Sequence, residues 1–193
     1  MAQPIINSVG DLVLTEPKTM LALADPFRLQ LLDELRREGP LTISALSAAL
    51  DIDEASLRAA LLEFAEGGFA YAEDDEVWRA RGKGFVFEIP DDPEGQAAGR
   101  QLANAMFSRC IDLARRWAAD AEPRLPIDWI RASGVLNTRI ALTSDELRDL
   151  QKGLERLIEP YITREAGDVP ADAARVRVLT HFMPEPPTVG PRA

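Results

Sequence analysis

Residues 21–71 read LALADPFRLQLLDELRREGPLTISALSAALDIDEASLRAALLEFAEGGFAY, and the turn signals and apolar spacing within them decide the predicted fold. Asp25-Pro26 indicates a helix start, because aspartate caps free backbone amides and proline suits the first helical position. The leucines that follow recur at helical spacing, which predicts a helix with one apolar face. Gly39-Pro40 then ends this helix, because proline cannot continue it.

Two shorter apolar stripes follow in the same stretch. Residues 42–50 show one at helical spacing, and residues 54–66 show another, with apolar side chains at i, i+4 and i+7. Asp53 can cap the second of these helices, and Gly67-Gly68 ends it. The sequence therefore predicts a helix, a short turn and a second helix, all packed on the helix before them.

The pattern changes after these helices. FAYAE (69–73) and VWRARGKGFVFEI (77–89) read as two short strands around an acidic turn, and a third short strand can follow Gly84. Helices and a hairpin in this order are typical of a winged helix-turn-helix, in which the second helix of the turn motif lies in the DNA major groove. The expected fold class is mostly α with a small β wing.

The second half is predicted to be a helical part with a late strand. A long helix is expected over about 94–119, and another begins at Thr143, where Glu146 three residues later completes a capping-box pattern. This last helix carries a leucine stripe. Residues 132–142 can be a strand or a loop. Residues 175–182 (RVRVLTHF) alternate polar and apolar side chains, which predicts a strand.

These patterns divide the chain into four parts. Residues 1–14 are irregular with some apolar character, and they either form an arm that packs on a partner subunit or fray. The other parts are a winged helix-turn-helix domain over 15–90, a helical dimerisation or effector region over 91–185, and a Pro-rich tail over 186–193.

The stretch quoted above resembles the DNA-binding core of ArsR-type (arsenical repressor) regulators. In that family a helix opens with Ala-Leu-Ala-(Asp/His)-Pro-x-Arg, and a Leu-x-x-Leu-x-x-x-Gly-Phe/Leu pattern precedes the wing. The residues that carry the match are Leu23-Ala24-Asp25-Pro26-Phe27-Arg28 and those from Leu61 to Phe69. The wing is similar to that of long members, which add a helical C-terminal part and a late strand. The resemblance covers about 15–90 closely and 91–185 loosely.

The resemblance implies a bacterial transcription regulator that binds a two-fold-symmetric operator as a homodimer. Such a protein would dimerise through helices outside the turn motif. The candidates are the helix that begins near Pro17 and the long helix around 94–119. The apolar stripe of the long helix can equally be part of the chain's own core.

Cysteine content separates this chain from the metal-sensing members of that family. Those members carry paired cysteines in the first helix of the turn, and residues 43–50 contain none. The whole chain has one cysteine, Cys110, and one histidine, His181, which are too few soft ligands for a Cys/His metal site. We therefore expect neither Cys-based metal sensing nor a metal or other cofactor.

The residues expected to contact DNA lie on the turn motif and the wing. They are Thr42, Ser44, Ser56, Arg58, Arg79, Arg81 and Lys83. The last three alternate along the chain, so on a strand they would share one face, although such a face is often simply solvated. Arg58 can instead pair with Glu54, one helical turn earlier.

The charge distribution opposes tight DNA binding. The net charge is −10, and residues 1–90 hold eight basic and sixteen acidic side chains, a net of −8. Because neutralised phosphates supply most non-specific affinity, we expect weak or strongly salt-dependent binding to double-stranded DNA. The alternative is a winged-helix interaction module whose acidic face binds a protein partner and in which DNA binding is lost or weakened.

Other functions fit the sequence less well. A single histidine and the absence of GxxxxGK[ST] and GxGxxG loops argue against an enzyme. No apolar run approaches the roughly 20 residues that cross a bilayer, and the first residues lack a signal-peptide pattern, so we expect a cytoplasmic location and no membrane partner. A candidate effector pocket in the second half would be lined by residues that a core equally contains, namely Met106, Phe107, Cys110, Trp117 and Trp129.

Overall fold

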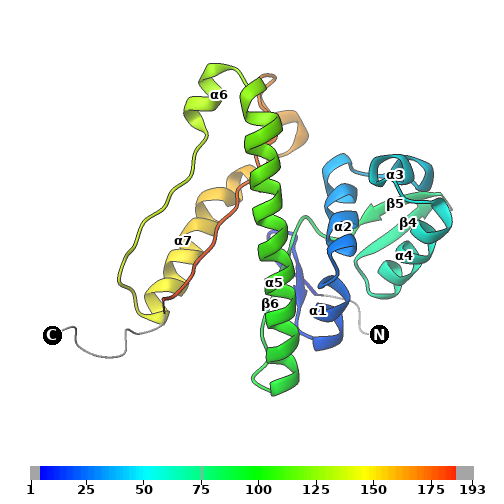
Figure 1. Cartoon of the computed structure of the whole chain (residues 1–193), viewed down its shortest axis with the longest axis horizontal. Helices are drawn as coiled ribbons and strands as arrows, with labels where there is room; N and C mark the ends of the chain where they lie inside the picture. Colours follow the sequence, from blue (N-terminus) through cyan, green and yellow to red (C-terminus); the bar gives the residue numbers. More distant parts are fainter. Residues whose placement is uncertain (1–4, 75, 186–193) are drawn as a thin grey trace. The chain divides into compact units, whose positions relative to one another are not determined.

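The computed structural model describes residues 5–74 and 76–185, and this part of the chain is mostly α-helical with two small sheets (Figure 1). The chain forms two compact units, residues 1–163 and 164–193. Two predicted features fall outside the described residues. They are the Pro-rich tail over 186–193 and, within the acidic turn, Asp75.

The first four helices of the first unit lie at the predicted positions. They are α1 (Pro17–Leu23), α2 (Pro26–Glu38), α3 (Ile43–Leu50) and α4 (Glu54–Glu66). Three of these helices start at a residue whose side-chain oxygen accepts a hydrogen bond from a backbone amide in the first turn. The pairs are Asp25 with Arg28 at 3.0 Å, Thr42 with Ala45 at 3.2 Å and Asp53 with Ser56 at 2.9 Å. The predicted caps at Asp25 and Asp53 are thus confirmed.

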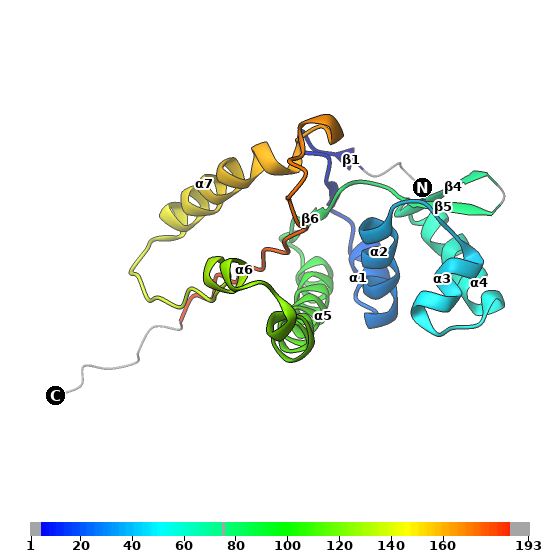
Figure 2. The same ribbon diagram turned by 90° about the horizontal axis from the view of Figure 1, so that it is seen from above.

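The predicted hairpin after α4 belongs to a three-stranded antiparallel sheet (Figure 2). Its strands are β3 (Leu41–Thr42), β4 (Ala70–Asp74) and β5 (Val77–Ala80), in the spatial order β3-β5-β4. The register between β4 and β5 shifts between Ala72 and Asp74, close to the turn. The short strand before α3 therefore closes the sheet on the side of β5 away from β4.

The second sheet pairs the beginning of the described chain with the segment after the hairpin. It has the order β1-β2-β6, with β1 (Ile5–Ile6) antiparallel to β2 (Leu12–Leu14) and β2 parallel to β6 (Phe85–Phe87). The predicted third strand after Gly84 is confirmed. The prediction of an irregular N-terminal arm is wrong in part, because Leu12 and Leu14 are buried in the chain's own core and pair with β6.

The core lies under α4 and joins the helices to both sheets. Its largest fully buried side chains are Phe64, Phe69, Leu12, Leu14, Met20, Leu23, Leu31, Leu32, Leu35, Leu46, Leu57 and Leu61. The rings of Phe64 and Phe69 are 5.5 Å apart at 59°, a tilted geometry that aromatic pairs favour. The i, i+4, i+7 stripe read from residues 54–66 is the buried face of α4.

Two arginines tie α2 to its neighbours. The Arg36 guanidinium donates a hydrogen bond to the carbonyl oxygen of Gly84 at 2.7 Å and lies 5.5 Å from the centre of the Phe85 ring. Burial lowers the pKa of Arg36 to about 10. Arg109 of α5 (Pro93–Arg116) forms a half-buried ion pair at 2.7 Å with Asp33 of α2. These contacts fix α2 between β6 and α5.

The regular elements of the rest of the first unit are helical. After α5 come the π-helical turn η1 (Trp117–Ala121), the 3-10 turn η2 (Glu122–Arg124), α6 (Ile127–Ala132) and α7 (Ser144–Ile162). The predicted capping box is confirmed, because the Thr143 hydroxyl accepts from the Glu146 amide while the Glu146 carboxylate accepts from the Thr143 amide. Of residues 132–142, left open between strand and loop, Ala132 is the last residue of α6 and 133–142 form neither a helix nor a strand.

The predicted late strand is wrong. In the described part of the second unit, residues 175–182 adopt no strand, and the regular element is the short 3-10 turn η3 (Ala166–Asp168). Alternation of polar and apolar side chains favours an extended backbone, but a strand also needs a neighbouring chain to satisfy its amides and carbonyls. No described strand pairs with this segment.

Adjacent leucines of α4 give a paired test of this core. Leu61 is fully buried, whereas Leu62 is 55% exposed. We expect Leu61→Ala to lower the free energy of unfolding by about 2–5 kcal/mol, because it leaves a cavity. Leu62→Ala should change it by no more than about 0.5 kcal/mol. Urea unfolding followed by circular dichroism measures both, and equal effects would contradict this packing.

Candidate nucleic-acid interface

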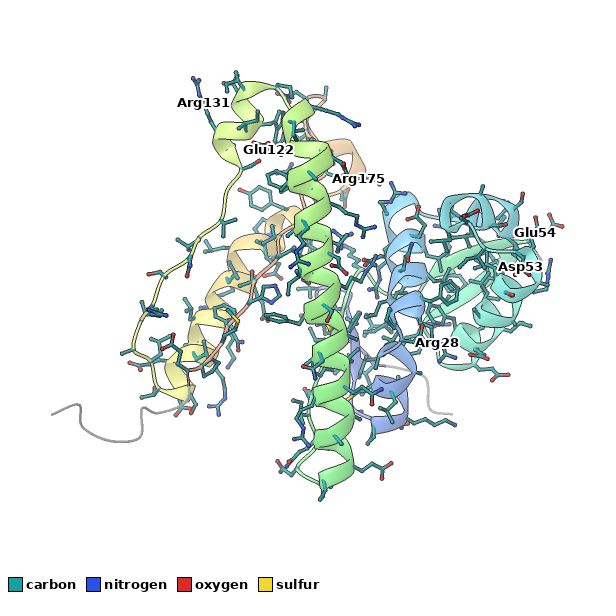
Figure 3. The ribbon with its side chains drawn as sticks, viewed as in Figure 1. Arg28, Asp53, Glu54, Glu122, Arg131 and Arg175 are labelled. Carbon is teal, nitrogen blue, oxygen red and sulfur yellow. The ribbon has the colours of Figure 1, made fainter. Side chains whose placement is uncertain are left out.

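The outward face of α4 is exposed along the length of the helix. Burial of its apolar stripe turns Ser56, Arg58 and Ala59 to the solvent, and all three are exposed. Figure 3 shows Asp53 and Glu54 at the outer end of this helix, pointing away from the core. A major groove about 12 Å wide admits one helix whose outer side is free. The geometry of α4 meets that requirement.

Helix α3 packs against α4 and presents the other predicted hydroxyl contacts. Ile43 and Leu46 are buried, which leaves Ser44 exposed in the first turn. The Thr42 hydroxyl oxygen accepts the Ala45 amide and so starts the helix. Thr42 therefore has a structural role, and its exposed hydroxyl is still placed to donate a hydrogen bond.

Arg58 is the basic residue on the exposed surface of α3 and α4. Its predicted alternative, an ion pair with Glu54, is absent: within the described residues Arg58 has no carboxylate within 4.0 Å. The neighbouring carboxylates are Asp51, Asp53, Glu54, Glu63 and Glu66, all of them exposed. Of these described carboxylates, Glu63 forms an ion pair with Arg28 of α2, and Asp53 accepts the Ser56 amide. This face is acidic around one unpaired cation.

The wing arginines lie on one face of the hairpin, as predicted, but each has a neighbour. Arg79 forms an ion pair with Glu73 at 2.7 Å, and this hydrogen bond raises the pKa of Arg79. The Arg81 guanidinium lies 5.4 Å from the centre of the Tyr71 ring. The Glu73 carboxylate therefore offsets part of the positive charge of Arg79.

Lys83 does not share that face, so this part of the prediction is wrong. Strand β5 ends at Ala80, and Gly82 has a φ of +76°, which turns the chain. A side chain at Gly82 would meet the Gly10 carbonyl at 3.1 Å, so glycine is also needed for space. The Lys83 ammonium donates a hydrogen bond to the carbonyl oxygen of Ile162 at 3.2 Å. Lys83 thus contacts the end of α7 instead of extending the wing.

The residues suggested for an effector pocket do not share one environment. Met106 packs against the core, Cys110 and Trp129 are half-buried, and Phe107 and Trp117 are exposed. Hollows of about 330 and 270 Å³ occur elsewhere, at the base of the hairpin. Ile6, Tyr71 and Arg81 line the first, while Arg36, Arg79 and Lys83 are among the residues that line the second. These hollows could not be predicted from the sequence, because they form between segments distant in the chain.

Comparisons with known proteins give no match to a family model, a curated protein or a solved structure. Among the described residues, no group of three or more His, Cys, Asp and Glu side chains is arranged to hold a metal ion. No described helix is both long and apolar enough to cross a membrane. Function is therefore inferred from the geometry and charge of this face.

The cap of α4 should make stability depend on pH. Hydrogen bonds from Ser56 lower the pKa of Asp53 below its usual range. A lowered pKa stabilises the fold above the unfolded-state value of about 4, and this contribution is lost as pH falls through the folded-state pKa. We expect the stability difference between the wild type and Asp53→Asn to shrink between about pH 5 and pH 2. Urea unfolding across this range tests it, and a constant difference would contradict it.

Proposed function

We propose that this chain is a DNA-binding transcription regulator that acts as a homodimer on a two-fold-symmetric operator. Helices α2, α3 and α4 followed by the β4–β5 hairpin have the order of a winged helix-turn-helix, and β3 pairs with β5. The observation that carries the proposal is the exposed outer face of α4, braced from beneath by α3. In this arrangement α4 is the recognition helix.

The contacts divide into base-reading and backbone-positioning groups. Ser56 and Arg58 lie in the first half of α4, the part of a recognition helix that meets base edges. Arg58 can contact guanine, which arginine reads through two hydrogen bonds. Arg79 and Arg81 on the hairpin suit phosphates, as do the hydroxyls of Thr42 and Ser44. Lys83 is not among the proposed DNA contacts, because its ammonium donates a hydrogen bond to the Ile162 carbonyl.

The acidic surroundings set the strength of this binding. Three cations, Arg58, Arg79 and Arg81, face the proposed duplex, and Glu73 partly neutralises one of them. Each phosphate contact contributes about −0.9 to the slope of log K against log salt concentration. One chain should therefore give a slope of about −3 or shallower. The protein is a weak, salt-sensitive DNA binder on which a ligand or partner can act.

A second candidate is a protein-interaction module, and the composition of the same face favours it. The outward side of α4 carries Ala55, Ala59 and Leu62 at i, i+4 and i+7, flanked by carboxylates. A short apolar stripe with an acidic rim suits a basic protein surface better than it suits phosphates. Recovery of a stoichiometric basic protein by the full chain, together with no DNA binding, would support this candidate.

A mobility-shift assay tests the leading proposal directly. We expect the full chain to retard labelled DNA from upstream of its own coding region at about 50 mM salt. This DNA binding should fall steeply by about 200 mM salt. Unrelated DNA of equal length is the control for specificity. No retardation at the lower salt, with or without candidate ligands, would contradict the proposal.

Arg58 gives the sharpest single-residue test. We expect Arg58→Ala to weaken specific DNA binding by about 1–3 kcal/mol, roughly 5- to 150-fold. Arg115→Ala is the matched control, since Arg115 is an exposed arginine on α5, outside the proposed interface. Fluorescence anisotropy with the same duplex measures both affinities. Equal losses in the two variants would show that α4 does not read the DNA.

A further inference from the structure

Half of the basic side chains of the first ninety residues lie around the base of the hairpin. Of the eight, Arg36, Arg79 and Lys83 line the hollow of about 270 Å³, and Arg81 lines the neighbouring one. The same ninety residues hold sixteen acidic side chains, and none of those that the structure describes lines either hollow. In so acidic a chain, this separation of charge makes the 270 Å³ hollow a place that attracts anions.

Arg36 lines this hollow from the last turn of α2, and most of its N–H donors are unused. Within the described residues it donates one hydrogen bond, to the Gly84 carbonyl, and its buried Nε–H has no acceptor. Burial lowers the pKa of Arg36 to about 10, although the carboxylates of Asp33 and Asp11 act to raise it. The guanidinium is therefore charged at neutral pH, and these carboxylates do not fully compensate for its burial.

The other two cations of the hollow differ in their partners. Lys83 is exposed, and its ammonium donates to the Ile162 carbonyl oxygen, which has no formal charge. Arg79 forms an ion pair with Glu73. Among the described side chains, Arg36 and Lys83 thus have no carboxylate at ion-pair distance. Two positive charges remain for a ligand to neutralise.

The size and the walls of the hollow restrict that ligand. A volume of about 270 Å³ lies just below the usual range of ligand sites, about 300–1,000 Å³, so the hollow suits a small molecule. Leu35 and Ala80 add apolar surface between the charges. A phosphate monoester carries close to two negative charges at neutral pH and has three acceptor oxygens, and both arginine and lysine bind this group.

We propose that the hollow binds a small phosphate monoester through Arg36, Arg79 and Lys83. Its effect on DNA rests on the proposed function, in which Arg79 contacts a DNA phosphate. A bound phosphate monoester and the DNA backbone then compete for Arg79. The ligand therefore weakens DNA binding, and DNA weakens ligand binding by the same factor, because the coupling between two binding equilibria is reciprocal.

Isothermal titration calorimetry of the full chain without DNA tests the site. The probe is phenyl phosphate, and benzoate is the comparison, since it has one negative charge and no phosphate. At constant ionic strength we expect saturable binding of phenyl phosphate and weaker binding of benzoate. Lys83→Gln should raise the dissociation constant of phenyl phosphate at least about tenfold, because it removes a charged hydrogen-bond donor. The matched control is Lys18→Gln, an exposed lysine of α1 outside both hollows, which should leave it unchanged.

Arg36→Lys tests the half-buried cation of α2. It keeps the positive charge and a donor for the Gly84 carbonyl but removes the planar fork, so we expect binding to weaken about tenfold. Circular dichroism confirms that each variant folds. Absence of saturable phenyl phosphate binding, equal affinity for benzoate, or unchanged affinity in both Lys83→Gln and Arg36→Lys would overturn the proposal.

Fluorescence anisotropy at constant ionic strength then tests the competition. Saturating phenyl phosphate should weaken binding of the upstream duplex about fivefold or more in the wild type. The same concentration should have little effect on Lys83→Gln, whose own DNA affinity stays near that of the wild type. DNA binding that bound phenyl phosphate leaves unchanged would contradict the shared use of Arg79. A chain that binds phenyl phosphate but no DNA would support the site and count against the regulator alone.

Discussion

The burial of one stripe of α4 is the constraint on which the rest of the first unit depends. Leu57, Leu61 and Phe64 fill the space between α3, the hairpin and α2. Because a helix has 3.6 residues per turn, burying these three side chains also fixes the direction in which every other side chain of α4 points. Ser56 and Arg58 face the solvent for that reason. The proposed DNA-reading surface is thus a consequence of core packing.

Local chemistry explains which parts of the fold the sequence predicts. The starts of α2, α4 and α7 depend on a capping side chain within three residues of the amide it binds, so Asp25, Asp53 and Thr143 were sufficient. The pairing of β2 with β6 joins segments about seventy residues apart, and no local pattern encodes it. The alternating residues 175–182 show the converse, since a strand pattern without a pairing partner forms no strand.

The candidate site was predictable in its positions and less so in its charges. Helical spacing placed Ser56 and Arg58 correctly on the exposed face of α4. Whether each wing cation is available to a phosphate depends on contacts that a sequence does not display. Glu73 forms an ion pair with Arg79, and the Ile162 carbonyl accepts a hydrogen bond from Lys83. The turn at Gly82 directs Lys83 away from the wing arginines. Counting basic residues therefore overestimates the positive charge available to a phosphate backbone.

The acidic surroundings of α4 bear on the homodimer of the proposed function. One chain offers few phosphate contacts, so a single unit of the proposed regulator would dissociate readily from DNA at physiological salt. In the proposed homodimer two units would bind as one, because the second contact becomes intramolecular and its effective concentration rises to the millimolar range. Weak contacts in each unit would then make DNA binding conditional on the dimer. Whatever loosened the proposed dimer would release the DNA, without any change in the exposed face of α4.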